Sequence, residues 1–372
     1  MNNIKNTLFV GDGRSIHTIT LANNLKSHNK NQRIEIFDIC GAKENSEVFD
    51  QCYNYNIIRL LSRKPKLLYI ARVFFSIALT FLKDKNKYNS VQLHFLGYIS
   101  PETAKLFKRK TTNLVAVFWG SDLFRTTNLD KLKRVISFCD TVHFSTNDME
   151  VYARKKLGNA LVGKKIIVNK FGVTGLDYLK EGFVDNPSSL IKFLLNKKRE
   201  GKKLVTVGYN AFENQQHIAI IKQLKNNANK DEYYFIFPMG YGRNEEYLIK
   251  VDEELATSGL DYKVLNEYFD NQDNANITLI TDIFIQLQVT DALSAAMQEH
   301  IYSGSNTITG SWLPYQDLDN AGVKYTKISS IDKLNTALSK IEDLSQMERV
   351  KNKEAIYMMS SWSSVIGGWD EI

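Results

Sequence analysis

The segment Val289–Gly304 (VTDALSAAMQEHIYSG) carries acids and hydroxyls whose types and spacing could bind a nucleotide sugar. Its apolar periodicity predicts a helix over Asp291–Ser303. Thr290 or Asp291 can cap the start of this helix, and Gly304 is placed to end it. One face of this helix packs, and the other is lined with hydroxyls and acids.

On this helix Asp291 and Glu299 share one face, about 12 Å apart along the axis. The free N–H groups and the dipole of a helix N-terminus favour a diphosphate there, and Ser294 lies close to that end. Glu299 can accept hydrogen bonds from both hydroxyls of a ribose. The pattern fits a half-exposed helix with ordinary surface acids equally well. His300 falls in the apolar face, and we expect it to be a core histidine.

A glycine-rich turn, Gly11-Asp12-Gly13-Arg14-Ser15, follows the first predicted strand and opens the first predicted helix. Such a turn lets backbone N–H groups approach a phosphate or a sugar closely, so Gly11 and Gly13 are donor-binding candidates. Arg14 and His17 are acceptor-side candidates at the same place. An ordinary tight turn with a surface histidine is the alternative, since the full GxGxxG pattern is absent.

Two residues are candidates for the catalytic base that removes a proton from an acceptor hydroxyl. Asp122 follows the predicted strand Leu114–Phe118, so it should lie at a carboxyl end. An N-cap of the next turn is the other interpretation of Asp122. His94, in a predicted strand, is the second base candidate, and a buried structural histidine is its alternative.

Further donor-binding candidates end strands or open helices in the second half of the chain: Asn210, His217, Gly240, Tyr241, Thr290 and Ser294. Backbone groups at Gly240 and the ring of Tyr241 could receive the nucleobase, although an ordinary glycine loop explains them as well. Asp317-Leu318-Asp319 has the form of a DxD metal motif, but it follows no central strand. We interpret it as loop acids and predict no metal.

Short β-rich runs alternate with helical patterns throughout, which predicts an α/β fold with mostly parallel sheets. The first series of strands is expected at Thr7–Val10, Ile34–Phe37, Ser90–Phe95, Leu114–Phe118, Thr141–Ser145 and Lys165–Asn169. The second is expected at Leu204–Val207, Tyr233–Pro238, Tyr262–Val264, Ile277–Ile280, Ile283–Gln288, Asn306–Thr309 and Lys324–Ile328. Two such halves in series predict a ligand cleft between the carboxyl ends of both sheets.

The linker is expected within Gly175–Lys203, which contains Asn186-Pro187-Ser188-Ser189 and a charged run. The expected domains are an N-terminal acceptor-side domain over 1–180 and a C-terminal nucleotide-sugar-binding domain over 200–350. A last helix over 351–372 is expected to pack back on the N-terminal domain, with Trp362 and Trp369 as packing residues.

The chain has 372 residues, a net charge of +7 and three widely spaced cysteines, which disfavours a disulfide framework and fits a reducing cytoplasm. No signal peptide is predicted. The apolar run Leu67–Leu82 is shorter than the roughly 20 residues of a spanning helix, so no transmembrane segment is predicted. Basic clusters at Arg59–Lys66, Lys83–Lys87 and Lys105–Lys110 flank it. They indicate either a surface that rests on anionic lipid or a buried helix with a solvated basic end. No nucleic-acid-binding pattern accompanies the charge.

Asp291 and Glu299, separated by seven residues and followed by Gly304, resemble the acid-x7-Glu signature of the large retaining family of GT-B glycosyltransferases. Asp291 stands where that family has Glu, and the family's Arg and Lys for the diphosphate are missing, so Asn210, His217 and Arg243 would have to supply the donors to the diphosphate. A closer resemblance is to the bacterial 4-acetamido-4,6-dideoxygalactose (Fuc4NAc) transferases, which act on lipid-linked intermediates of enterobacterial common antigen synthesis. Four blocks carry it: Phe118–Leu123, Gln215–Ile218, Pro238–Tyr241 and Thr290–Ala296 running on to Gly310–Tyr315.

The resemblance implies a GT-B fold, with two Rossmann-like domains, a cleft between them and a C-terminal helix that crosses back. It implies a hexosyltransferase that moves a sugar from a nucleotide-sugar donor to a glycan acceptor, lipid-linked, in bacterial surface polysaccharide synthesis. We expect no cofactor, no nucleic-acid partner, and a cytoplasmic location with peripheral association at the inner face of the cell membrane. A non-catalytic sugar-nucleotide-binding or scaffold protein is the alternative. A nicotinamide-dependent oxidoreductase, with Asp38 on the ribose, is a third hypothesis.

Overall fold

The computed structural model describes residues 4–41, 47–82, 88–183, 187–242 and 244–372. The chain forms two compact units: unit 1 comprises Met1–Gly172 and Trp362–Ile372, and unit 2 comprises Val173–Ser361. The chain therefore enters unit 2 before the stretch in which the sequence places the linker, and its last residues return to unit 1. The basic cluster Lys83–Lys87 and Arg243, a third possible phosphate ligand beside Asn210 and His217, lie outside the described residues.

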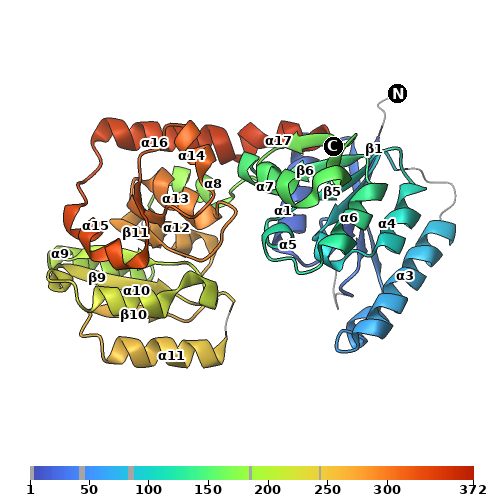
Figure 1. Cartoon of the computed structure of the whole chain (residues 1–372). Helices are drawn as coiled ribbons and strands as arrows, with labels where there is room; N and C mark the ends of the chain where they lie inside the picture. Colours follow the sequence, from blue (N-terminus) through green and yellow to red (C-terminus); the bar gives the residue numbers. More distant parts are fainter. Residues whose placement is uncertain (1–3, 42–46, 83–87, 184–186, 243) are drawn as a thin grey trace. The chain divides into compact units, whose positions relative to one another are not determined.

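Unit 1 is built on a parallel sheet of seven strands in the order β3-β2-β1-β4-β5-β6-β7 (Figure 1). The strands are β1 (Lys5–Gly11), β2 (Gln32–Asp38), β3 (Gln51–Asn54), β4 (Ser90–His94), β5 (Leu114–Val117), β6 (Thr141–Phe144) and β7 (Lys165–Val168). The order reverses between β1 and β4, which is the point where ligands bind in open α/β sheets.

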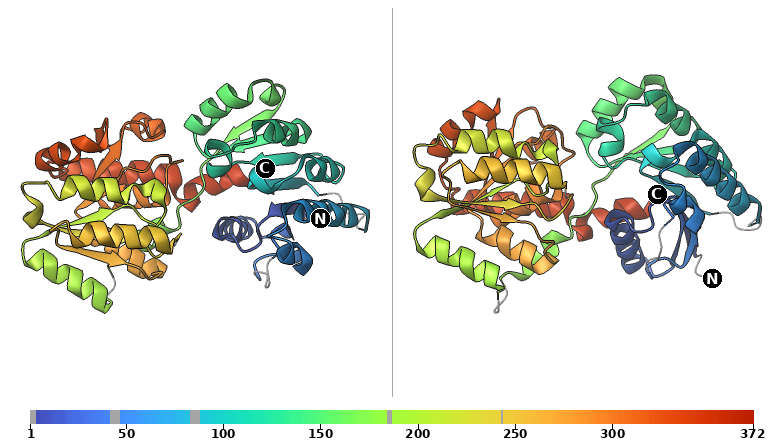
Figure 2. Two further views of the ribbon diagram at one scale, coloured as in Figure 1. Left: turned by 60° about the horizontal axis from the view of Figure 1, so that its bottom comes forward. Right: turned by 90° about the horizontal axis from the view of Figure 1, so that it is seen from below.

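Helices cover both faces of this sheet (Figure 2). They are α1 (Ile16–His28), α2 (Asn56–Leu60), α3 (Pro65–Leu82), α4 (Pro101–Lys108), α5 (Ser121–Phe124), α6 (Leu129–Phe138), α7 (Asn147–Leu157) and α17 (Trp362–Asp370). Helices α1 and α17 share one apolar core with Phe9 and Val115, to which Trp362 and Trp369 contribute. The prediction that these two tryptophans are packing residues is confirmed. On the opposite face, Phe37 meets Phe107 of α4, with ring centroids 5.7 Å apart.

Unit 2 repeats the plan with a parallel sheet of six strands in the order β10-β9-β8-β11-β12-β13. The strands are β8 (Lys203–Val207), β9 (Tyr233–Pro238), β10 (Tyr262–Leu265), β11 (Ile283–Gln286), β12 (Asn306–Gly310) and β13 (Thr326–Ile328). The helices are α8 (Gly175–Glu181), α9 (Ser189–Arg199), α10 (His217–Leu224), α11 (Glu245–Ala256), α12 (Asn271–Ile280), α13 (Ala295–Ser303), α14 (Gln316–Asn320), α15 (Leu334–Lys340) and α16 (Gln346–Ser360). The switch in strand order lies between β8 and β11.

The alternation of side chains along β11 explains why both faces of this sheet are covered. Ile283 and Ile285 point into a core shared with α10, α11 and α15, while Phe284 points into a second core shared with α8, α12, α13 and α16. Successive side chains of a strand face opposite sides of the sheet, so an unbroken apolar run requires helices on both. The parallel α/β architecture predicted from the sequence is confirmed.

Three predictions about individual elements are wrong. Ile277–Ile280 is the last turn of α12, not a strand, because Asp270 caps a helix there by accepting from the N–H of Asp273 at 2.8 Å. The stretch expected to be the linker contains α8 and α9, and Ser188 caps α9. Asp317 and Asp319 belong to the short helix α14 and are not loop acids. A short apolar run cannot be assigned to strand or helix by periodicity alone.

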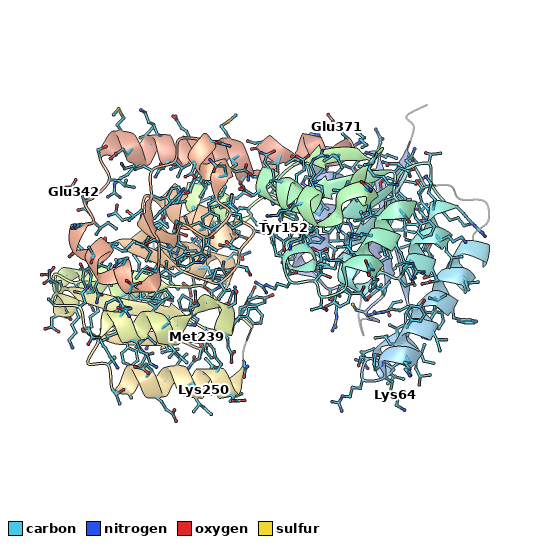
Figure 3. All side chains as sticks on the ribbon, viewed as in Figure 1. Lys64, Tyr152, Met239, Lys250, Glu342 and Glu371 are labelled. Carbon is cyan, nitrogen blue, oxygen red and sulfur yellow. The ribbon has the colours of Figure 1, made fainter. Side chains whose placement is uncertain are left out.

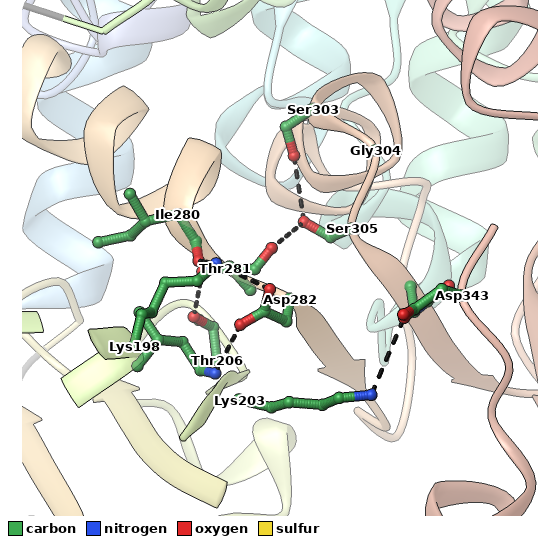
Figure 4. Close-up of polar contacts among 12 residues, drawn as sticks. Lys198, Lys203, Thr206, Ile280, Thr281, Asp282, Ser303, Gly304, Ser305 and Asp343 are labelled. Atoms are coloured by element: carbon green, nitrogen blue, oxygen red, sulfur yellow. Dashed lines mark hydrogen bonds and ion pairs between the residues drawn. The ribbon is translucent and has the colours of Figure 1, made fainter. Parts of the chain in front are cut away.

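The amino edge of each sheet is held by the same pairing of an aspartate with a lysine. Asp282 precedes β11, accepts from the N–H of Leu204 at 2.8 Å and pairs with Lys198 of α9 at 2.8 Å (Figure 4). In unit 1, Asp140 makes the equivalent contacts with the N–H of Leu114 and with Lys108. Each aspartate satisfies an N–H group in the first two residues of a neighbouring strand. Backbone N–H groups at the amino edges are therefore satisfied by side chains of the same unit. The candidate ligand-binding residues lie at the carboxyl edges.

Among the described residues, no helix combines the length and the apolar character that crossing a membrane requires.

Candidate functional site

The carboxyl ends of β8 and β11, at the switch point of unit 2, are followed by polar loops that contact one another. The N–H of Val289 donates to the backbone oxygen of Asn214 at 2.8 Å, and the side-chain amide of Asn214 donates to Gln288 Oε1 at 2.8 Å. Asn214 also binds Thr290, through the backbone oxygen at 3.1 Å and the N–H at 3.2 Å. The predicted donor residue Thr290 is thus part of the loop framework at the expected place.

The helix that carries Glu299 begins later than the sequence predicts. It starts at Ala295, with Ser294 as N-cap accepting from the N–H of Met297 at 3.3 Å. Leu293 precedes the cap with a positive φ of 64°, so the chain up to that point is a loop. The prediction that Thr290 or Asp291 caps the helix is therefore wrong. The axial distance from the helix start to Glu299 falls from the predicted 12 Å to about 6 Å.

Asp291 holds this loop in place. One carboxylate oxygen accepts from the N–H of Ser294 at 2.8 Å and from the hydroxyl of Tyr315, and Gln286 Nε2 lies 3.5 Å from it. Burial raises the pKa of Asp291, although these hydrogen bonds oppose the shift. Burial, with the charge of Asp291, also raises the pKa of Tyr209. Asp291, a donor-binding candidate in the sequence, is therefore engaged by its own neighbours at one carboxylate oxygen.

Sequence reasoning missed several members of this network, namely Tyr209, Asn214, Gln286, Gln288 and Tyr315. Gln286 and Gln288 end an apolar strand, and polar side chains at the carboxyl end of a buried strand are a signal that could have identified them. Trp312, in the block Gly310–Tyr315 that carries part of the sequence resemblance, donates from Nε1 to the backbone oxygen of Gln288 at 2.9 Å.

Glu299 lies on α13 above the first residue of α8. A Cβ added to Gly175 would stand 2.0 Å from Glu299 Oε1, so the carboxylate rests directly on that glycine. Burial alone raises the pKa of Glu299 to about 7. Among the described residues, no cation or hydrogen-bond donor offsets this desolvation. A carboxylate in this state gains from a ligand that brings hydroxyl donors.

The other donor-binding candidates of unit 2 separate into surface and core. Tyr241 is 59% exposed and meets the edge of Phe212, with ring centroids 5.9 Å apart. Asn210 is buried and accepts from the N–H of Phe212 at 3.0 Å. Gly240 packs so closely that an added Cβ would stand 1.9 Å from the backbone oxygen of Glu267.

His217 opens α10 as predicted, but it lies in the core of unit 2. Its Nδ1 is 3.3 Å from the hydroxyl of Tyr247, and burial lowers its pKa to about 4. The ring is therefore neutral at physiological pH and unsuited to hold a diphosphate by charge. His300 is confirmed as a core histidine: it is buried and stacks on Phe284 with centroids 4.0 Å apart.

The two glycines of the turn in unit 1 pack directly against residues of neighbouring strands. A Cβ on Gly11 would stand 3.0 Å from that of His94, and one on Gly13 would stand 3.2 Å from Asp38 Oδ2. Arg14 is exposed, and its N–H donates to Asp12 Oδ1 at 2.9 Å. His17 lies beside the ring of Trp119, with centroids 5.0 Å apart, and desolvation lowers its pKa.

His94 lies in a strand as predicted and is the last residue of β4, but its ring is fully buried between Phe9 and Trp119, with centroids 4.5 Å and 5.7 Å away. Neither ring nitrogen has a hydrogen-bond partner in the described part of the chain. Burial, and to a smaller extent His143, lowers the pKa of His94 to about 3. A group with this pKa and no access to solvent is a poor base near neutral pH, so we assign His94 to the core of unit 1.

Asp122 joins the carboxyl ends of β4 and β5. Its Oδ1 accepts from the N–H of Trp119 at 2.9 Å and its Oδ2 from that of Leu96 at 3.1 Å. Burial raises the pKa of Asp122 to about 6, against the effect of these bonds. The half-buried side chain lines a cavity of about 410 Å³, together with Tyr98, Arg125 and Lys131. A carboxylate with this pKa beside a cavity can act as a base near neutral pH.

Asp12, Asp38 and Cys40 bring oxygen and sulfur atoms within 4.8 Å of one another. Asp38 is buried and accepts from the N–H groups of Cys40 and Gly41 at 2.8 Å and 3.1 Å. Burial raises the pKa of the Cys40 thiol to about 12, so it stays protonated and is a poor metal ligand. Because Asp38 serves its own loop, the oxidoreductase hypothesis loses its ribose-binding residue.

No protein-family model matches the chain, and no curated protein does. Solved structures match nearly all of it. The α,α-trehalose 6-phosphate synthase of Burkholderia multivorans has a TM-score of 0.74 at 9% identity, over 99% of this chain and 95% of that one. Sucrose-phosphate synthase of Thermosynechococcus elongatus has a TM-score of 0.70 at 11% identity, over 99% and 98%.

The trehalose-6-phosphate protein of E. coli bound with UDP-2-fluoro glucose has a TM-score of 0.68 at 12% identity, over 98% of this chain and 97% of that one. The chain therefore has the GT-B fold of glycosyltransferases across both of its units, as the sequence predicts. At this level of identity the likeness shows the fold alone.

Proposed function

We propose that the chain is a glycosyltransferase that moves a sugar from a nucleotide donor to a glycan acceptor, as a metal-independent hexosyltransferase. The observation that carries the proposal is Glu299, a desolvated carboxylate for which the described residues supply no donor, on the helix that follows the switch point of the second GT-B unit. A ribose supplies the two hydroxyl donors that this carboxylate lacks. One relative in fold is bound with UDP-2-fluoro glucose, a nucleotide sugar.

In this proposal the donor lies along α13. The N–H groups of Ala295 and Ala296, which have no partner within the helix, bind the diphosphate, and Glu299 binds the ribose. The exposed rings of Tyr241 and Phe212 receive the nucleobase. Amides take the place of the basic pair that the large retaining family uses.

Transfer forms a bond between the acceptor's hydroxyl oxygen and the anomeric carbon of the sugar. The bond from that carbon to the nucleoside diphosphate breaks, and the diphosphate leaves with the electron pair. Asp122 takes the proton of the hydroxyl, because its raised pKa and its place on a cavity suit a base.

The acceptor in this proposal is lipid-linked, as in bacterial surface polysaccharide synthesis, and the chain rests peripherally on the membrane that holds it. The four sequence blocks that resemble the Fuc4NAc transferases support such an acceptor. The surface of α3 supports it as well. Leu67, Ile70 and Phe74, at helical spacing on one stripe, are 46%, 60% and 61% exposed.

Basic residues surround this stripe. Arg59, Arg63 and Lys66 are exposed beside it, and Lys64 lies at the start of α3 (Figure 3). The sequence has no Asp or Glu between Asp50 and Asp84. An apolar stripe that basic residues adjoin in the sequence fits an anionic lipid surface.

Thermal unfolding with UDP, GDP, dTDP and CMP tests donor binding. We expect at least one nucleotide to raise the Tm of the wild type and to have a much smaller effect on Glu299→Ala. Glu253→Ala, at an exposed acid of the same unit, is the matched control and should respond as the wild type does. No shift with any nucleotide, or an equal shift in Glu299→Ala, would contradict the proposal.

Nucleotide binding without transfer to any lipid extract would favour the second candidate, a non-catalytic sugar-nucleotide-binding protein. The observation behind that candidate is Asp291, whose carboxylate serves its own loop.

A further inference from the structure

A second, smaller cavity of unit 1 lies among α3, α4 and α6 and carries two cations on its wall. Its volume is about 210 Å³. Arg72 reaches it from α3 and Lys131 from α6, and Ser100, the N-cap of α4, lines it as well. It is smaller than the roughly 300–1,000 Å³ of pockets for drug-sized ligands, so it suits a compact group.

Both cations bind backbone oxygens in the described part of the chain. Arg72 donates from Nε to the backbone oxygen of Ile39 at 2.7 Å, and its Cζ stands 5.6 Å from the centre of the Tyr98 ring. Lys131 donates from Nζ to the backbone oxygen of Gly97 at 2.7 Å. In the part of the chain that the structure describes, neither makes an ion pair with a carboxylate. Two unpaired cations on one cavity wall attract an anion.

The charges around Lys131 agree with this. Desolvation, and then repulsion by Arg72, lowers the pKa of Lys131, while the charge of Glu102 opposes the shift. Glu102 itself is engaged elsewhere: it accepts from the Tyr69 hydroxyl at 2.5 Å and pairs with Arg134 at 3.4 Å. A bound anion would relieve the repulsion between the two cations.

We propose that this cavity binds the phosphate or diphosphate group of a lipid, and that this lipid carries the acceptor sugar. Only the role of this lipid as the acceptor rests on the proposed function. The binding site itself rests on the cavity and its two cations. The same helix α3 that supplies Arg72 presents the exposed stripe of Leu67, Ile70 and Phe74 on its outer surface. At about 100° per residue, Arg72 lies on the face of α3 opposite this stripe, and Tyr69, which is 45% exposed and lines the cavity, lies between the two. A lipid whose tail lies on the stripe would therefore reach the cavity with its headgroup past Tyr69.

The arrangement also orients the sugar that follows the phosphate. Tyr98 and Lys131 line both this cavity and the larger one that contains Asp122. A headgroup held by Arg72 and Lys131 would therefore direct an attached sugar into the larger cavity, toward the candidate base. Arg72 and Lys131 would be binding residues for the acceptor, and the acceptor class would be a sugar linked to a lipid through phosphate.

Binding of a prenyl diphosphate in phosphatidylcholine vesicles to the full chain tests the site, with inorganic diphosphate as the soluble arm. We expect the vesicles to bind and each of Arg72→Gln and Lys131→Gln to weaken binding about tenfold or more, because each removes a charge-assisted hydrogen bond. Arg154→Gln and Lys155→Gln remove the same charges from exposed positions of α7 in unit 1 and should change binding little.

Equal losses in the control variants would overturn the proposal, because binding would then follow net charge alone. Equal affinity for inorganic diphosphate and for the vesicles would contradict the proposal that the bound phosphate belongs to a lipid. An unchanged Tm without ligand shows that each variant is folded, and each is also titrated with the nucleotide that stabilises unit 2. Nucleotide binding with no binding of the prenyl diphosphate refutes this site alone. Binding of the prenyl diphosphate without nucleotide binding refutes the proposed donor site and supports this one.

Discussion

Glu299 and Asp291 show what a pair of spaced acids can and cannot reveal. The spacing led to Glu299 as a ribose ligand, and the structure gives it an uncompensated carboxylate. The same spacing assigned Asp291 to the donor, but Tyr315, which lies in a later block, turns out to donate to it. A sequence shows the type of an acid but not which distant hydroxyl will satisfy it.

The raised pKa of Glu299 predicts how nucleotide affinity depends on pH. Ribose hydroxyls donate to the ionised carboxylate, so binding lowers its pKa and requires loss of a proton below about pH 7. We expect a nucleotide sugar to bind about tenfold more weakly at pH 6 than at pH 8. The stability of the unliganded chain should move the opposite way, because a raised carboxyl pKa makes folding less favourable as pH rises through about 7.

Isothermal titration at several pH values measures this dependence, with Glu299→Gln as the control. The amide keeps the shape of the side chain and does not titrate, so its profile should be flat apart from any titration of the ligand itself. A wild-type profile that matches that of Glu299→Gln would remove Glu299 from the donor site.

At the scale of elements, strands were easier to predict than the ends of helices. Tyr233–Pro238 is β9 as predicted, because a run of aromatic and branched residues between turn signals has few alternatives. The start of α13 was misplaced because Asp291 and Ser294 are both good N-caps. The choice between them depends on Leu293, whose positive φ breaks the helix before Ser294. Tertiary contacts set such a conformation, and the local sequence does not show it.

The amino-edge aspartates predict a separation of stability from binding. Asp282→Ala removes the acceptor for the Leu204 N–H and leaves Lys198 without its ion pair, at a cost of about 1–3 kcal/mol. We expect a lower Tm in differential scanning calorimetry and an unchanged nucleotide affinity, since the substitution lies at the edge of the sheet opposite to α13's N-terminus. A large loss of affinity in a variant that remains folded would show that the two edges are coupled.

At the scale of the whole molecule, the plan of two parallel sheets was predictable and the limits of the units were not. Identities of 9% to 12% accompany TM-scores of 0.68 to 0.74 because many sequences satisfy the same alternation of apolar strands and amphipathic helices. The change of unit at Val173 has no such signal. Of the residues that indicate a linker, Pro187 and Ser188 precede α9 and Ser189 begins it, because serine is a helix cap as well as a loop residue.

The exposed stripe of α3 predicts that the full chain binds anionic vesicles through one surface. Ile70→Ser and Phe74→Ser each remove an apolar side chain that is about 60% exposed, so each should weaken binding to phosphatidylglycerol vesicles roughly tenfold. Ile249→Ser is the matched control, because Ile249 is 58% exposed on α11 of unit 2.

Raising the salt concentration should also weaken vesicle binding, since the Lys and Arg side chains near the stripe attract the lipid by charge. Flotation of the wild type and the three variants at two ionic strengths measures both contributions. Equal binding by Ile70→Ser and Ile249→Ser would mean that charge alone brings the chain to lipid and that the stripe has another partner.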